Sequence, residues 1–232
     1  MICARGSHAG GKRVKDTIAD AEIGHRPYPV AVDFQPVRDA YSSLSEEYIA
    51  LYDGDWLHED EGSLIRRHLT GLPGAVLDVG CGPGYWTAHL HSLGVEVTGV
   101  DLVPEFIAHA RATHPGVEFR LGSMTDLDVP EHSVAGVLAW YSTIHLPPGD
   151  LDRTLAGFRR LLAFSGVLVL GFFDSEDEVA AFDHAVVTAY RWPADVFAER
   201  LAKAGFTEVQ RLRRQNPERP DRRYAVIAAR AS

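Results

Sequence analysis

Residues 76–86 read VLDVGCGPGYW, and this stretch decides the fold. A short apolar run leads into three alternating glycines, Gly80, Gly82 and Gly84, and a helix-like segment follows at once. Glycine allows a tight turn and lets a ligand approach the main chain. A strand, a glycine turn and a helix in this order are found in many nucleotide-binding α/β folds.

Outward from this turn, strand-like and helix-like segments alternate. Apolar runs predict strands at 75–79, 95–100, 117–121, 134–140, 167–173, 206–212 and 224–229. Periodic apolar positions predict helices at 35–52, 61–69, 85–93, 104–113, 150–162 and 194–204. The alternation predicts an α/β, Rossmann-like, doubly wound sheet of seven mostly parallel strands. Helices cover both faces, the C-terminal strand is antiparallel, and an N-terminal helical cap precedes the sheet.

The length of 232 residues suits one α/β domain, which we place at residues 31–232. We expect residues 1–30 to form a mobile tail. Residues 6–11, GSHAGG, resemble a cloning remnant and are set aside from the fold argument.

The charge balance of the chain argues against a nucleic-acid-binding function. Lys and Arg total 23 and Asp and Glu total 32, which gives a formal net charge of −9. Phosphate binding needs a concentrated basic surface, so we expect no nucleic-acid partner. One basic stretch is interpreted as solvated strand ends and their turn. It comprises Arg211, Arg213, Arg214, Arg219, Arg222 and Arg223.

Hydropathy and cysteine usage point to the cytoplasm. No run of 18 apolar residues occurs, so we expect no membrane partner. Cys3 and Cys81 are too few for a disulfide framework and lack the spacing of a metal site. We therefore expect a cytoplasmic protein without a metal, either a monomer or a homodimer.

Asp78, two residues before Gly80, indicates the charge of the ligand. A carboxylate repels a pyrophosphate and attracts a cation. The dinucleotide fingerprint would also need Gly or Ala where Tyr85 stands. Asp101 follows the next strand, where an acid can accept both ribose hydroxyls of an adenosine. The alternative is that each acid only caps a loop or helix.

VLDVGCGPG followed by Asp101 resembles the class I S-adenosylmethionine-dependent methyltransferases, and WYSTIH at 140–145 resembles a group of small bacterial members. The resemblance implies S-adenosylmethionine as cofactor and S-adenosylhomocysteine as product. It implies that the glycine loop holds the methionine part, the second-strand acid the ribose, and residues after the third strand the adenine. The cofactor-binding residues expected on this basis are Tyr48, Asp78, Gly80, Cys81, Gly82, Gly84, Asp101, Leu102, Ser123, Met124 and Trp140. Many relatives carry an acid where Ser123 stands, so a charged adenine contact is not expected.

The segment AWYSTIHLPP at 139–148 places aromatic and imidazole side chains at a strand end. We take His145 as the candidate general base and Tyr141 as the residue that orients it. By resemblance, AYRWP at 189–193 lies over the substrate cavity, and an arginine there suits a carboxylate. The substrate-binding residues expected are Tyr141, His145, Phe173, His184, Tyr190 and Arg191. Core packing is the alternative interpretation for Tyr41, Tyr48, Trp140, Tyr190 and Trp192.

Together these residues predict methyl transfer to an oxygen or nitrogen of a small-molecule metabolite. One alternative is an S-adenosylmethionine-binding protein or non-methylating catalyst with the same fold. A second is an NAD-dependent oxidoreductase, against which Asp78 and Tyr85 argue. Nucleic-acid methylation is disfavoured because an Asn/Asp-Pro-Pro-aromatic sequence is missing after the fourth strand.

Overall fold

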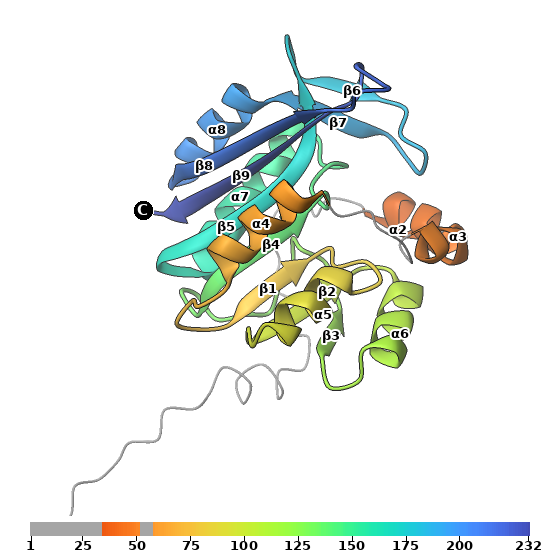
Figure 1. Cartoon of the computed structure of the whole chain (residues 1–232), viewed down its shortest axis with the longest axis vertical. Helices are drawn as coiled ribbons and strands as arrows, with labels where there is room; N and C mark the ends of the chain where they lie inside the picture. Colours follow the sequence, from red (N-terminus) through yellow and green to blue (C-terminus); the bar gives the residue numbers. More distant parts are fainter. Residues whose placement is uncertain (1–33, 52–57) are drawn as a thin grey trace, which may run out of the picture.

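The glycine turn follows an inner strand of one mixed sheet. The computed structural model describes residues 34–51 and 58–232, so the expected tail at 1–30 lies outside the described residues. The expected strands are β1 (Val76–Val79), β2 (Val97–Asp101), β3 (Glu118–Leu121), β4 (Val134–Trp140), β5 (Leu162–Ser175), β8 (Phe206–Gln215) and β9 (Arg223–Ala231). They lie in the order β3-β2-β1-β4-β5-β9-β8 (Figure 1). Strands β1 to β5 are parallel, and β9 is antiparallel to β5 and β8.

A short hairpin adds to the predicted sheet. β6 (Ala180–Phe182) pairs antiparallel with β7 (Ala189–Pro193). β7 in turn pairs with the end of β5, where Phe173 lies opposite Arg191. β4 pairs with β5 only as far as Gly171, so the last residues of β5 have an edge that still needs hydrogen-bond partners. These partners come from β7, the segment at 189–193 that the sequence predicts only to lie over the substrate cavity.

Helices cover both faces of the sheet. They are α4 (Glu59–Leu69), α5 (Tyr85–Ser92), α6 (Pro104–Thr113), α7 (Pro148–Leu161) and α8 (Ala194–Lys203). Alternate strand residues point to opposite faces. Leu168 and Leu170 pack in one cluster with α7 and α8, whereas Val167 and Val169 pack in another with α4 and α5. The predicted doubly wound arrangement is confirmed.

The N-terminal cap is two helices and not one. The predicted helix at 35–52 divides into α2 (Gln35–Ser43) and α3 (Ser45–Leu51), while residue 52 lies outside the described residues. Leu44 leaves helical geometry with φ −111° and ψ 12°, and its N–H bonds to the carbonyl of Tyr41, three residues back. Figure 1 shows α2 and α3 side by side, away from the α4 face.

Gly84 closes the turn before α5. Its φ of 93° lies in the left-handed region that favours glycine. A Cβ atom there would come within 2.7 Å of the Phe119 ring and 2.9 Å of Ala110. The turn is therefore tied to α6 and β3 by close packing.

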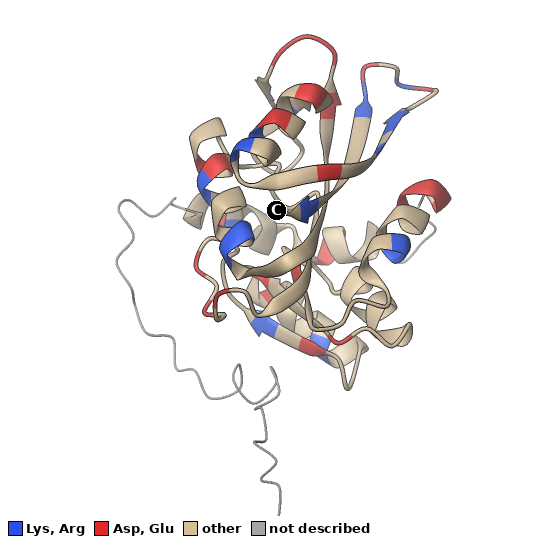
Figure 2. Ribbon diagram, turned by 90° about the vertical axis from the view of Figure 1, so that its left-hand side faces the viewer, with Lys and Arg blue, Asp and Glu red and all other residues tan. Residues whose placement is uncertain are grey.

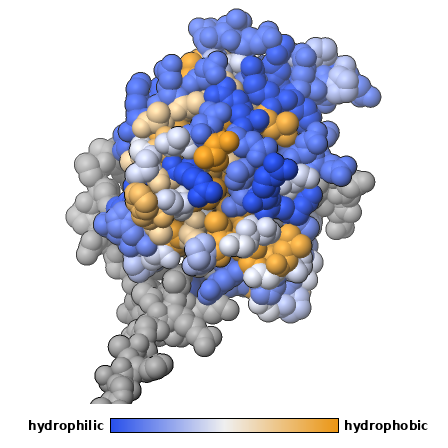
Figure 3. Space-filling model, turned by 60° about the vertical axis from the view of Figure 1, so that its left-hand side comes forward, coloured by the Kyte–Doolittle hydropathy of each residue, from blue (hydrophilic) through white to orange (hydrophobic). Residues whose placement is uncertain are grey.

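The surface carries both signs of charge. Figure 2 shows acidic and basic residues interspersed over the helices and strand ends. On the face in Figure 3, apolar side chains form small patches within a hydrophilic surface, which is ordinary for a folded domain. None of the described helices has the length and apolar character needed to cross a bilayer.

Two phenylalanines test the contribution of the α7 layer. Phe158 is 0% exposed in the larger core cluster, whereas Phe164 is 83% exposed. We expect Phe158→Ala to lower the free energy of unfolding by about 3–5 kcal/mol because it leaves a cavity. Phe164→Ala, the matched control, should change it by roughly 0.5 kcal/mol or less. Urea denaturation measures both, and equal losses would contradict the assigned core.

Candidate functional site

A cavity of about 710 Å³ lies at the carboxyl ends of the central strands. The N-terminal cap, the glycine turn and the β8–β9 hairpin all contribute to its wall. Of the residues predicted from sequence, the structure brings to it Tyr48, Asp78, Gly80, Cys81, Gly82, Trp140, Tyr141, Phe173 and His184. The others lie outside its lining: Gly84, Asp101, Leu102, Ser123, Met124, His145, Tyr190 and Arg191.

Asp78 is a buried acid with unused hydrogen-bonding capacity. It is 1% exposed, and its Oδ2 accepts a 2.6 Å hydrogen bond from the Thr87 hydroxyl. Its Oδ1 has no partner among the described residues. Burial raises the pKa of Asp78 to about 7, and the nearby Asp101 adds to the increase. Because a positive ligand would lower this cost, the side chain suits an ammonium or sulfonium group.

The main chain around Gly80 is pressed against the strand β4 side of the cavity. Gly80 has φ 72°, and a Cβ atom there would lie 2.3 Å from the Cβ of Ser142. Gly82 lies 4.0 Å from the Tyr48 ring by the same measure. Any side chain at Gly80 would therefore displace Ser142, which follows Tyr141 of the cavity lining.

Asp101 bridges the two strand-end loops. Its Oδ2 accepts the N–H of Gly82 at 2.8 Å and its Oδ1 accepts the N–H of Val103 at 2.9 Å. Burial raises the pKa of Asp101 to about 6, although hydrogen bonds from Val103, Gly82 and Leu102 oppose the increase. Asp101 is thus first a structural brace, and its carboxylate, which accepts from three N–H groups, retains lone-pair capacity for a ligand hydroxyl.

The other cofactor residues predicted outside the lining have local structural roles. Gly84 packs against α6, as described above. The Ser123 hydroxyl pairs with that of Thr125 at 2.9 Å within its own turn. Met124 packs partly against the larger core cluster. The Cε of Met124 would also lie 3.4 Å from a Cβ atom at Gly80, and the adenine interpretation of this segment stays a prediction.

Aromatic side chains form the wall beyond the glycine turn. The Trp140 and Tyr141 ring centroids are 4.8 Å apart, and Trp140 also meets Trp86 edge-on at 5.9 Å. Tyr141 has φ 51°, a left-handed conformation that costs free energy in a non-glycine residue. This conformation turns the chain sharply just after β4, at the segment where the sequence predicts substrate-binding residues.

His145 lies behind Tyr41 and outside the cavity lining, and its assignment as general base stays a prediction. Its Nδ1 is 2.9 Å from the carbonyl oxygen of Thr188, and its Nε2 is 2.9 Å from the Tyr41 hydroxyl. A carbonyl only accepts, so Nδ1 carries the proton and Nε2 accepts from Tyr41. Tyr41 lines the cavity, whereas His145 does not. Burial lowers the pKa of His145, so the ring is neutral at pH 7.

The segment 184–191 divides between cavity and packing. His184 lines the cavity, and burial, helped by His145 and Arg222, lowers its pKa to about 4. Arg191 instead lies 4.3 Å over the Phe182 ring. Tyr190 packs against the core, and its N–H bonds to the carbonyl of Ile144. Strand pairing in the β6–β7 hairpin places Arg191 and Tyr190 in these packing contacts, outside the cavity lining, and their assignment as ligand contacts stays a prediction.

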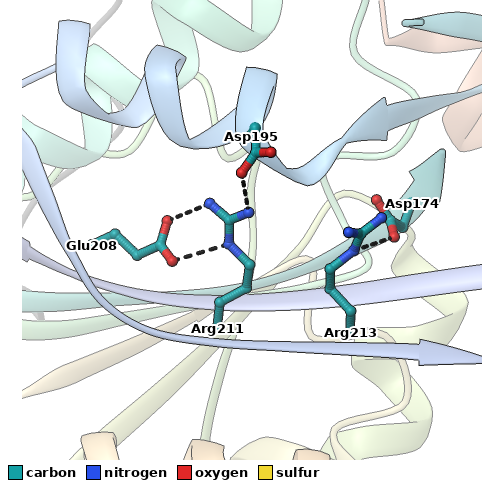
Figure 4. A network of polar contacts seen from close by, with 5 residues as sticks. All are labelled: Asp174, Asp195, Glu208, Arg211 and Arg213. Carbon is teal, nitrogen blue, oxygen red and sulfur yellow. Dashed lines mark hydrogen bonds and ion pairs between the residues drawn. The ribbon is translucent and has the colours of Figure 1, made fainter. Parts of the chain in front are cut away.

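The basic stretch at 211–223 contains a cavity residue that sequence reasoning missed. Figure 4 shows Arg211 bound to Glu208 and Asp195, and Arg213 bound to Asp174. Arg214 points elsewhere and lines the cavity, together with Glu61 and Tyr224. Alternation along β8 separates Arg214 from Arg213, which was the available signal. The solvated interpretation is wrong for Arg214.

Known methyltransferases resemble this chain in the region that contains the glycine turn. Residues 76–166 match the family described as a methyltransferase domain. Malonyl-acyl-carrier-protein O-methyltransferase of Yersinia pestis is 31% identical over 150 residues, covering 61% of this chain and 51% of that protein. The chain spans about half the length of the curated relatives it matches.

Solved structures cover more of the chain. A 1,6-didemethyltoxoflavin-N1-methyltransferase of Burkholderia thailandensis, with bound 1,6-didemethyltoxoflavin and S-adenosylhomocysteine, is 26% identical. It has a TM-score of 0.73 over 89% of this chain and 93% of its own. The (4+2)-cyclase SpnF, 18% identical, has a TM-score of 0.70 over 87% of this chain and 97% of its own, and shares the fold alone.

The raised pKa of Asp78 predicts a stability change with pH. Between its ordinary 3.8 and about 7, the folded state holds a proton that the unfolded state has lost. The ligand-free protein therefore loses stability as pH rises through this window. We expect Asp78→Asn to be more stable than wild type at pH 8 by on the order of 4 kcal/mol, with the difference nearly vanishing near pH 4.

Urea unfolding at pH 4, 6 and 8 measures this difference. The exposed Asp126→Asn is the matched control, because its carboxylate is solvated before and after unfolding. The same pH dependence in both variants would show that burial of Asp78 carries no such cost.

Proposed function

This chain carries a class I S-adenosylmethionine-dependent methyltransferase domain, and on that premise we propose that it methylates an oxygen or nitrogen of a small molecule. The observation that supports this most is Asp78, a buried acid with an unpartnered oxygen beside a glycine turn. The Yersinia relative is named for O-methylation and the Burkholderia enzyme for N1-methylation, so both kinds of acceptor atom remain open.

The residues at the glycine turn fit S-adenosylmethionine by charge. Asp78 would meet its positive methionine end, the main chain at Gly80 and Gly82 would line it, and Tyr48 would cover it from α3. Asp101 would accept from the ribose through its remaining lone pairs. The sulfonium supplies a methyl group with a good leaving group already attached, so the protein has mainly to position the acceptor.

Tyr41 and His145 provide a route for the proton of the acceptor. Tyr41 lines the cavity, and its hydroxyl donates to Nε2 of His145, whose Nδ1 is anchored on Thr188. Tyr41 can pass its proton to Nε2 while taking one from the acceptor. His145 thus acts through Tyr41, and it matters only when the acceptor atom must lose a proton.

Two rivals are separated by direct tests. A non-methylating catalyst stays open because a cyclase shares the fold, and fold likeness does not decide chemistry. A dinucleotide-dependent oxidoreductase would place a pyrophosphate against Asp78, which is disfavoured because like charges repel.

We also propose a cytoplasmic location, with which the free thiol of Cys81 accords.

We expect titration calorimetry to show binding of S-adenosylmethionine and S-adenosylhomocysteine but not of NADH. Asp78→Asn should weaken S-adenosylmethionine at least about tenfold, because it removes a charge-assisted contact. Asp126→Asn is the control and should bind as wild type does. A panel of planar phenols and N–H heteroaromatics should then yield S-adenosylhomocysteine with at least one acceptor. Absence of binding to either nucleoside would refute the proposal.

With any such acceptor, we expect Tyr41→Phe and His145→Gln to lower kcat by about 10²–10⁴, as loss of general-base assistance does. The pKa of His145 lies below its usual 6.5, so wild-type kcat should be level above about pH 6.5 and fall only in more acidic solution. The exposed His91→Gln is the control. A wild-type rate in His145→Gln across this range would remove the pair from the reaction.

A further inference from the structure

Arg214 is the arginine of the basic stretch that faces the cavity. Its side chain is 24% exposed, and its Nε lies 3.3 Å from Oε1 of Glu61. The Glu61 side chain is only 4% exposed and comes from the first turn of α4. A buried carboxylate 153 positions away in sequence therefore fixes the direction of this guanidinium.

The guanidinium of Arg214 is held in place, yet most of its N–H donors have no acceptor among the described residues. Its central carbon lies 4.2 Å over the Tyr224 ring, and stacking of this kind suits arginine. Among the described residues, nothing accepts a hydrogen bond from Nη1 or Nη2. Four N–H groups thus remain for a ligand in a fixed fork, the geometry that matches an oxyanion.

The distribution of charge separates Arg214 from the glycine turn. Of the described residues that line the cavity, only Arg214 is permanently positive. It lies on β8, which is the fourth strand away from β1 in the order β1-β4-β5-β9-β8. Strands lie about 4.8 Å apart, so the two backbones are about 19 Å apart across the sheet. The negative Asp78 and the positive Arg214 therefore serve different parts of the cavity.

Aromatic rings lie between these two charges. The Tyr224 centroid is 6.1 Å from that of Tyr141 and 5.9 Å from that of Phe173, and Tyr141 and Phe173 are 5.6 Å apart. Next to Arg214 on the lining is Asn216, whose Oδ1 already accepts the N–H groups of Glu218 and Arg219. Only its amide N–H groups remain for a ligand, so Arg214 and Asn216 both offer donors beside the paired Glu61.

We propose that Arg214 binds an oxygen anion of the methyl acceptor, which is therefore a planar aromatic molecule carrying a carboxylate or similar group. Its ring packs against Tyr224, Tyr141 and Phe173, and the atom to be methylated points toward the glycine turn. The inference rests on the proposed function, because it assigns the far end of the same cavity.

The test compares two ligands of equal shape and different charge. Titration calorimetry is run with 2-naphthoate and with neutral 2-naphthamide, on ligand-free protein and on protein saturated with S-adenosylhomocysteine. The variants are Glu61→Gln/Arg214→Gln, which removes both charges and leaves no lone buried carboxylate, and the exposed Arg219→Gln as matched control. S-adenosylhomocysteine and 5′-methylthioadenosine, which lacks the amino-acid part, are titrated separately.

We expect wild type and Arg219→Gln to prefer naphthoate by about ten- to hundredfold, as charge-assisted hydrogen bonds do. The double variant should lose this preference and bind naphthamide unchanged. Equal binding of the two ligands by wild type overturns the inference. So does a double variant that weakens S-adenosylhomocysteine but not methylthioadenosine, because Arg214 would then hold the carboxylate of the cofactor. Failure of S-adenosylhomocysteine to bind wild type refutes the proposed function instead, and the naphthoate preference of ligand-free protein still tests Arg214.

Discussion

The functional site depends on the burial of one carboxylate, that of Asp78, which is almost inaccessible to water. Asp78 receives one hydrogen bond, from Thr87, and its second oxygen has no donor among the described residues. Burial without full pairing raises the free energy of the charged form. The folded protein can carry this cost because two apolar layers, one on each face of the sheet, stabilise it. The site is thereby poised for a cation before any ligand arrives.

Glu61 is a second buried carboxylate, and its charge is compensated by an ion pair with Arg214. Arg214 keeps most of its own donors in this pair. A cavity with an unpaired acid near β1 and a partly paired guanidinium on β8 is polar along its length. Such a cavity orients a cation and an anion toward opposite ends, with aromatic rings between them. Orientation of this kind supplies much of the rate when the leaving group is already good.

Local patterns allowed most of the fold to be predicted. Residues 76–79, 97–101 and 134–140 are strands because short apolar runs end in turns, and Asp78 was found because its charge contradicts a pyrophosphate. The β6–β7 hairpin was missed because it depends on how far β5 extends beyond β4, which no local pattern states. The break at Leu44 was missed because the apolar spacing continues through it.

The site was harder to predict because its pairs are remote in sequence. Tyr41 and His145 are 104 positions apart, and Glu61 and Arg214 are 153 apart. A sequence shows that a histidine follows a strand, but not that a phenol covers its Nε2. That cover changes the chemistry. Tyr41 lines the cavity with an uncharged imidazole behind it, so the proton-accepting pair that we propose adds no charge to a site that already contains Asp78. The proposed proton-accepting pair and the desolvated acid are thus separate groups, and Asp78 is left for the cationic ligand.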